Sequence, residues 1–186
     1  MNNEPDTSPP AKPDGPGRKA GAALVVASLM ALTACGEDGA ATPSLIEVAG
    51  VDYGYEGLPA TIAAGSEIVF SNESADEAHE FVALRLADDD TRTAGEILAL
   101  PPEELGPLLA DVSSVLVAAP EGPAFLAEGS ATLDEPGRYV VMCLIPTGAD
   151  PDEYLAAAAE AEGGPPDVAG GPPHFVEGMW AELVVE

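Results

Sequence analysis

The chain has 186 residues and a formal net charge of −27 at pH 7. A surface this acidic repels phosphate groups, which argues against DNA or RNA as a partner. Glycine (20 residues) and proline (19 residues) are frequent, whereas aromatic residues make up 5 % of the chain. This composition favours many short elements joined by turns rather than long helices, so we predict a β-rich fold.

The acidic side chains are spread along the sequence, and beyond residue 34 they are opposed by arginine alone, with no lysine. A dispersed acidic surface most simply maintains solubility. The alternative is that the surface attracts a basic partner or cations.

Residues 1–34 are predicted to be a signal peptide. Arg18 and Lys19 precede an apolar segment, residues 20–34, that is too short to span a membrane comfortably. The segment ends in Leu-Thr-Ala followed by Cys35, which resembles the lipobox of bacterial lipoprotein precursors. The resemblance implies cleavage before Cys35, a diacylglycerol on its sulfur and anchoring at the outer face of the cell membrane. An ordinary secretory signal is the alternative.

Residues 35–44 are small and polar, which is typical of a flexible tether. If Cys35 carries lipid, the exported chain has a single remaining thiol, Cys143, and no partner with which it could form a disulfide. An unpaired thiol in an oxidising compartment is a liability unless it is buried or bound to a metal.

Residues 45–186 show short apolar runs between turn signals, with no helical period, which predicts a β-sandwich. The region between residues 87 and 123 interrupts this pattern with two helical segments. We expect strands at residues 45–51, 58–62, 67–70, 79–86, 124–126, 128–133, at a run ending at Cys143, and at 180–185, with helices at 93–100 and 102–111.

A second helical insertion follows Cys143. Asp150 and Glu153 flank Pro151 in the pattern of a helix start, and an alanine-rich segment continues to Glu162. Two glycines and a proline then end the predicted helix, and a Gly/Pro-rich return leads to His174.

Several stretches together resemble the cupredoxins, the family of plastocyanin, amicyanin and pseudoazurin. They are the run from Ile62 to Asn72, His79, the Pro-Gly-Arg-Tyr turn that leads to Cys143, and His174 followed by Met179. The resemblance implies an all-β Greek-key sandwich, here with two short helical insertions. It also implies one type 1 copper site, with His79, Cys143 and His174 as a trigonal ligand set and Met179 as a weak axial ligand. Thiolate, imidazole and thioether are the donors of such blue-copper sites.

One feature departs from that family: 30 residues separate Cys143 from His174, whereas small electron carriers have only a few. The leading functional hypothesis is a membrane-anchored type 1 copper protein that transfers single electrons at the cell surface to an unidentified partner. A metal-free interaction module and a copper delivery or sequestration protein are the alternatives. An enzyme is not expected, because beyond these two histidines the chain has no histidine for further copper ligation.

Overall fold

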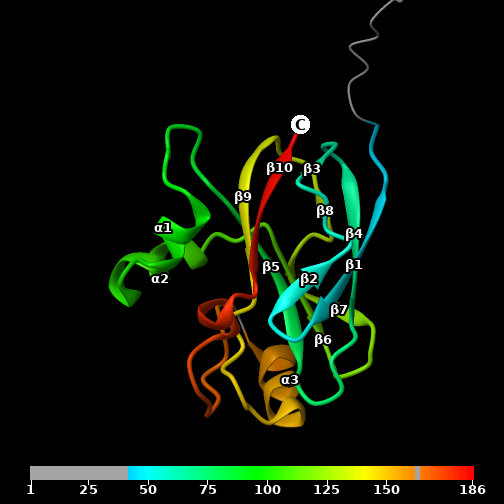
Figure 1. Ribbon diagram of the computed structural model, residues 1–186, viewed down its shortest axis with the longest axis vertical. Coiled ribbons are helices and arrows are strands. Elements are labelled where there is room, and N and C mark those ends of the chain that lie inside the picture. Colours follow the sequence, from blue (N-terminus) through cyan, green and yellow to red (C-terminus); the bar gives the residue numbers. More distant parts are fainter. Residues whose placement is uncertain (1–41, 162–163) are drawn as a thin grey trace, which may run out of the picture. The chain divides into compact units, whose positions relative to one another are not determined.

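Two β-sheets packed face to face dominate the computed structural model, which describes residues 42–161 and 164–186. The predicted signal peptide, Cys35 and most of the tether at residues 35–44 lie outside the described residues. Within the described ranges, no helix is both long enough and apolar enough to cross a bilayer. The predicted all-β sandwich is confirmed, and Figure 1 shows its strands together with the helical segments beside them.

The smaller sheet has the strand order β2-β1-β4-β8. β1 pairs in parallel with β4, and the other pairs are antiparallel. Side chains alternate between buried and outward-facing positions along β4, as expected for a sheet with one face on the core. The strands are β1 (Leu45–Val51), β2 (Gly54–Glu56), β4 (Ser66–Asn72) and β8 (Thr132–Leu133).

The larger sheet has the order β3-β10-β9-β5-β6-β7. β10 pairs in parallel with β3, and all other neighbouring strands of this sheet pair antiparallel. The strands are β3 (Thr61–Ile62), β5 (His79–Arg85), β6 (Ser114–Ala118), β7 (Ala124–Gly129), β9 (Gly137–Met142) and β10 (Trp180–Val185).

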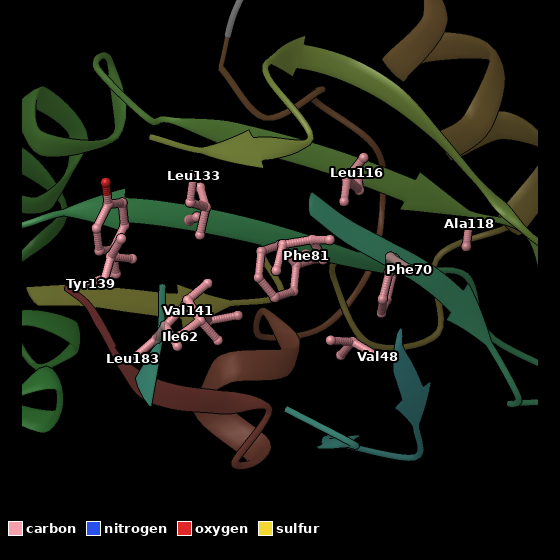
Figure 2. Close-up of a cluster of buried hydrophobic side chains, with 13 residues drawn as sticks. Val48, Ile62, Phe70, Phe81, Leu116, Ala118, Leu133, Tyr139, Val141 and Leu183 are labelled. Carbon is pink, nitrogen blue, oxygen red and sulfur yellow. The ribbon is translucent and has the colours of Figure 1, made fainter. Parts of the chain in front are cut away.

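The sandwich core lies between the two sheets (Figure 2). Phe70 from the smaller sheet packs with Phe81 from the larger one, and their ring centroids are 6.1 Å apart. The central strand β5 is buried on both faces: Phe81 faces this core, whereas Val82 faces a second cluster beneath the helices. This double burial explains why β5 reads as a continuous apolar run without alternation.

The first insertion, α1 (Ala94–Leu98) and α2 (Pro102–Leu109), covers the outer face of the larger sheet. Thr93 caps α1 in a complete capping box with Glu96. Arg138 donates hydrogen bonds to the carbonyl oxygens of Asp90 and Arg92, which fixes the loop before α1 to strand β9. Arg138 therefore stabilises the position of the first insertion against the larger sheet.

The second insertion carries α3 (Pro151–Glu160), followed by a 3₁₀ turn, η1 (His174–Glu177). Asp150 caps α3 through the backbone N–H of Glu153, as the sequence predicted. Tyr154 on α3 is fully buried. α3 is thereby fixed to the sandwich.

Strand β6 corrects the sequence interpretation, which predicted helices at residues 93–100 and 102–111 and no strand between residues 87 and 123. Its run Ser-Val-Leu-Val-Ala is short and mostly buried, so it shows no period-2 alternation. Pairing with β5 on one side and β7 on the other makes it a strand. The short hairpin strand β2 was also missed.

Candidate metal centre

Three side-chain atoms from distant parts of the sequence converge at one end of the sandwich. Nδ1 of His79 lies 3.2 Å from Nδ1 of His174, and Sγ of Cys143 lies 3.3 Å from the same His174 nitrogen. All three donor atoms lie within 4.8 Å of one another. The three side chains are buried, with exposed fractions of 0–1 %. The group forms a compact cluster of two imidazoles and a thiol closed to solvent.

Strand pairing brings these residues together. His79 is the first residue of β5, and Cys143 directly follows β9, its neighbour in the sheet. β10 lies on the other side of β9, and the loop before β10 carries His174 and Met179. The register of three adjacent strands therefore delivers all of the predicted ligands to one sheet end.

The 30-residue insertion is closed at its base by backbone hydrogen bonds. The N–H of His174 donates to the carbonyl of Ile145 at 2.9 Å, and the N–H of Phe175 donates to that of Cys143 at 3.0 Å. Further out, Thr147 pairs with Pro172 and Gly171. We call this paired segment, residues 143–147 with 171–175, the neck. It holds His174 beside Cys143 as a short loop would.

Met179 lies directly beside the cluster and is fully buried. Its N–H donates to the carbonyl of His174, and its carbonyl accepts from the N–H of Cys143, each at 3.1 Å. Gly178, with φ of +114°, makes the turn that a side chain would strain. Met142 packs in the separate cluster beneath α1 and α2, on the opposite face of the strand, and is therefore not a ligand candidate.

Burial controls the protonation of the cluster. Desolvation, assisted by the neighbouring His174, lowers the pKa of His79 to about 4. Burial also lowers the pKa of His174 and raises that of the Cys143 thiol well above its usual value. Near neutral pH the cluster therefore holds two uncharged imidazoles and a protonated thiol, and a thiolate requires a positive ion beside it.

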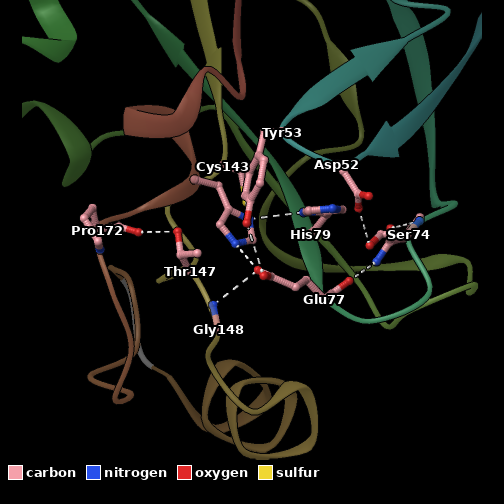
Figure 3. Close-up of polar contacts among 11 residues, drawn as sticks. Asp52, Tyr53, Ser74, Glu77, His79, Cys143, Thr147, Gly148 and Pro172 are labelled. Atoms are coloured by element: carbon pink, nitrogen blue, oxygen red, sulfur yellow. Dashed lines mark hydrogen bonds and ion pairs between the residues drawn. The ribbon is translucent and has the colours of Figure 1, made fainter.

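Glu77 and Tyr53 complete the surroundings of His174, and sequence reasoning identified neither of them. Figure 3 shows the Glu77 side chain reaching towards the cluster. Its Oε2 accepts a hydrogen bond from Nε2 of His174 at 2.5 Å, and its Oε1 accepts one from the Tyr53 hydroxyl at 3.3 Å. One glutamate among many acids in the chain gives no distinguishing signal. Its position two residues before His79 was the one feature of the sequence that placed Glu77 near the predicted site.

A fully buried carboxyl group, that of Glu80, lies on the opposite face of β5 from His79. It accepts hydrogen bonds from the backbone N–H of Leu144 (2.8 Å) and the hydroxyl of Tyr154 (3.0 Å). Its complete burial raises its pKa to about 7. Glu80 thereby links α3 to the residue that follows Cys143.

The donor set fits copper. Imidazole and thiolate are the ligands of type 1 sites, and a nearby thioether is their usual weak fourth donor. Two nitrogens 3.2 Å apart can share one ion, because metal–imidazole bonds measure about 2.0–2.1 Å. Nδ1 of His174 faces both the Cys143 sulfur and Nδ1 of His79, so the three donors lie around a common point. The cupredoxin resemblance and the single copper site that it implies are thus supported by the sandwich and by this cluster.

Comparison with known proteins found no matching family model and no matching curated protein. Solved structures of auracyanins are similar. The dithionite-reduced auracyanin of Roseiflexus castenholzii is 20 % identical, with 78 % of this chain and 98 % of that chain covered at a TM-score of 0.43. Auracyanin A, a blue copper protein of Chloroflexus aurantiacus, is 18 % identical, with 78 % and 100 % covered at a TM-score of 0.41. Auracyanin B is 16 % identical, with 78 % and 91 % covered at a TM-score of 0.36.

Proposed function

We propose that the chain is a type 1 copper protein that carries single electrons on the outer side of the cell membrane. The observation that carries this proposal is the convergence of two imidazole nitrogens and one thiol sulfur in a site closed to water. His79, Cys143 and His174 would hold the ion, with Met179 as the axial donor. A bound copper ion would supply a one-electron Cu(II)/Cu(I) couple.

The protein's part in electron transfer is to keep the ligands still. β5 and β9 hold His79 and Cys143, and the neck holds His174. Because packing rather than solvent surrounds these side chains, a change in charge at the site would cause little movement or water reorganisation. Complete burial of the ligands also favours retention of copper over delivery to another protein.

The visible and EPR spectra of the copper-loaded, full-length protein test this proposal. We expect an intense thiolate-to-copper absorption in the wild type and its loss in Cys143→Ser, because a hydroxyl cannot supply the charge transfer of a thiolate. Reversible one-electron reduction should accompany the band. A wild-type protein that takes up Cu(II) without this absorption would contradict the type 1 assignment, and one that takes up no copper would favour a metal-free module.

We further propose that residues 1–34 are removed on export, that Cys35 carries the lipid, and that residues 35–44 connect it to a domain at residues 45–186. The lipobox-like sequence before Cys35 supports this part of the proposal. Cys35→Ala should move the protein from the membrane fraction to the soluble fraction. A variant that stays membrane-bound after a salt wash would contradict lipid anchoring.

A further inference from the structure

Glu77 binds the His174 imidazole at Nε2, on the side of the ring that faces away from His79 and Cys143. Its carboxylate accepts hydrogen bonds from Nε2 of His174, from the Tyr53 hydroxyl and, at 3.4 Å, from the backbone N–H of Gly148 (Figure 3). These donors come from the turn after β1, the start of the second insertion and the loop before β10. One side chain thus joins the three segments that surround His174.

The contact fixes which nitrogen of His174 carries the proton. A carboxylate can only accept, so Nε2 of His174 is the donor and the neutral ring carries its lone pair on Nδ1. That lone pair faces Cys143 and His79. His79 has no equivalent support, because its Nε2 is buried without a hydrogen-bond partner among the described residues. Of the two imidazoles, His174 is the one that a carboxylate orients.

Tyr53 shows that this arrangement is built into the fold. Its ring packs edge-to-face against His174, with centroids 5.2 Å apart. Its φ of +58° is in the left-handed region, which is unfavourable for a bulky residue and is tolerated where the surroundings enforce it. With Glu77, whose side chain is 24 % exposed, Tyr53 covers a His174 ring that is itself fully buried.

We propose that Glu77 is a positioning residue that orients His174 as a copper ligand and, through its negative charge, favours Cu(II) over Cu(I). This inference rests on the proposed copper function. The charge lies one imidazole ring away from Nδ1 of His174, and this intervening ring is fully buried, so the charge is less screened than in water and stabilises the more highly charged ion. Glu77 therefore lowers the reduction potential and strengthens Cu(II) binding.

The test compares Glu77→Gln with Asp76→Asn in the full-length protein. Both substitutions remove one negative charge from the same loop, but Asp76 is exposed and touches no ligand. We expect Glu77→Gln to raise the reduction potential and to weaken Cu(II) binding about tenfold or more, as is typical when a partner of a metal ligand is removed. Asp76→Asn should change neither, and Glu77→Asp should keep the potential near that of the wild type.

Equal potentials and affinities in Glu77→Gln and Asp76→Asn would overturn the inference. If Glu77→Gln does not fold, Tyr53→Phe replaces it: this variant keeps the carboxylate but loses one of its donors, and we expect severalfold weaker Cu(II) binding. Unchanged binding would then count against the inference.

If the wild type binds no copper, the proposed function fails. Nitrogen NMR of the metal-free protein then tests the positioning alone. We expect the His174 proton on Nε2 in the wild type and a mixture of tautomers in Glu77→Ala. An unchanged tautomer would overturn the positioning role.

Discussion

The backbone N–H of His174 donates to the carbonyl of Ile145 at 2.9 Å, although a helix-bearing insertion separates the two residues. This bond, together with the one between Phe175 and Cys143, places the second imidazole beside the thiol. The long connection between the expected ligands is therefore compatible with a defined site. Lengthening a loop costs little free energy when its two ends are already paired.

The neck can be tested at Gly170, which packs closely against it. A Cβ on Gly170 would lie 2.5 Å from Cβ of Pro146, too close without a shift of the backbone. We expect Gly170→Ala to lower the free energy of unfolding by about 1–3 kcal/mol and to weaken copper binding by displacing His174. Urea unfolding of the metal-free protein and a chelator competition measure the two effects.

Gly171→Ala is the matched control, because its Cβ would approach Thr147 no closer than 3.4 Å. This substitution should have a clearly smaller effect on both quantities. Equal copper affinities in the two variants would show that the neck does not position the ligand.

Copper binding should release a proton from Cys143. Burial raises the pKa of this thiol well above its usual value, so it is protonated in the metal-free protein near neutral pH. His79, whose pKa is lowered to about 4, is already neutral there. We therefore expect the apparent copper dissociation constant to fall about tenfold per pH unit between roughly pH 6 and 8, with one proton released per ion.

Isothermal titration in buffers of different ionisation enthalpy counts the released protons. Cys143→Ser, which has no ionisable group at this position, should show a nearly flat dependence of affinity on pH in the same range. A flat dependence in the wild type would mean that the thiol does not bind the ion as a thiolate.

The sequence singled out the three residues that cluster, and predicted most of the strands, for identifiable reasons. Few histidines and cysteines are present, so His79, Cys143 and His174 stand out, and their order along the chain resembles that of a known family. Turn residues and short apolar runs marked β1, β4, β5 and β9.

What the sequence did not predict depends on tertiary contacts. The neck is made of backbone hydrogen bonds, which leave no trace in residue type. Glu77 is one acid among many, and the positive φ of Tyr53 is imposed by its surroundings rather than by a glycine. Strand β6 was missed because burial on both faces removes the alternation by which a strand is recognised.

Glu80 should make the metal-free protein less stable as the pH rises. Its pKa is raised to about 7 in the folded state from 4.5, so between these values the folded protein binds more protons than the unfolded chain. The free energy of unfolding therefore falls through this window. Glu80→Gln removes the effect, and we expect the wild type to lose about 3 kcal/mol relative to the variant between pH 4.5 and 9.

His79 has the opposite influence, because its lowered pKa of about 4 makes stability rise with pH up to its ordinary value of 6.5. The His79 contribution is the same in the wild type and in Glu80→Gln. The difference between their free energies of unfolding therefore reports the contribution of the Glu80 carboxyl group alone. Urea midpoints across the pH range measure it. Parallel profiles would contradict a buried, proton-binding Glu80.

Met179 and Met142 provide an internal comparison for the axial ligand. Both are fully buried, but Met179 contacts the cluster and Met142 lies beneath the helices on the other face of the sheet. Met→Leu conserves volume and should cost less than about 1.5 kcal/mol at either position. We expect Met179→Leu to keep the visible band and raise the reduction potential, because loss of a fourth donor destabilises Cu(II) more than Cu(I). Met142→Leu should leave the potential unchanged, and the same potential in both variants would exclude Met179 as a ligand.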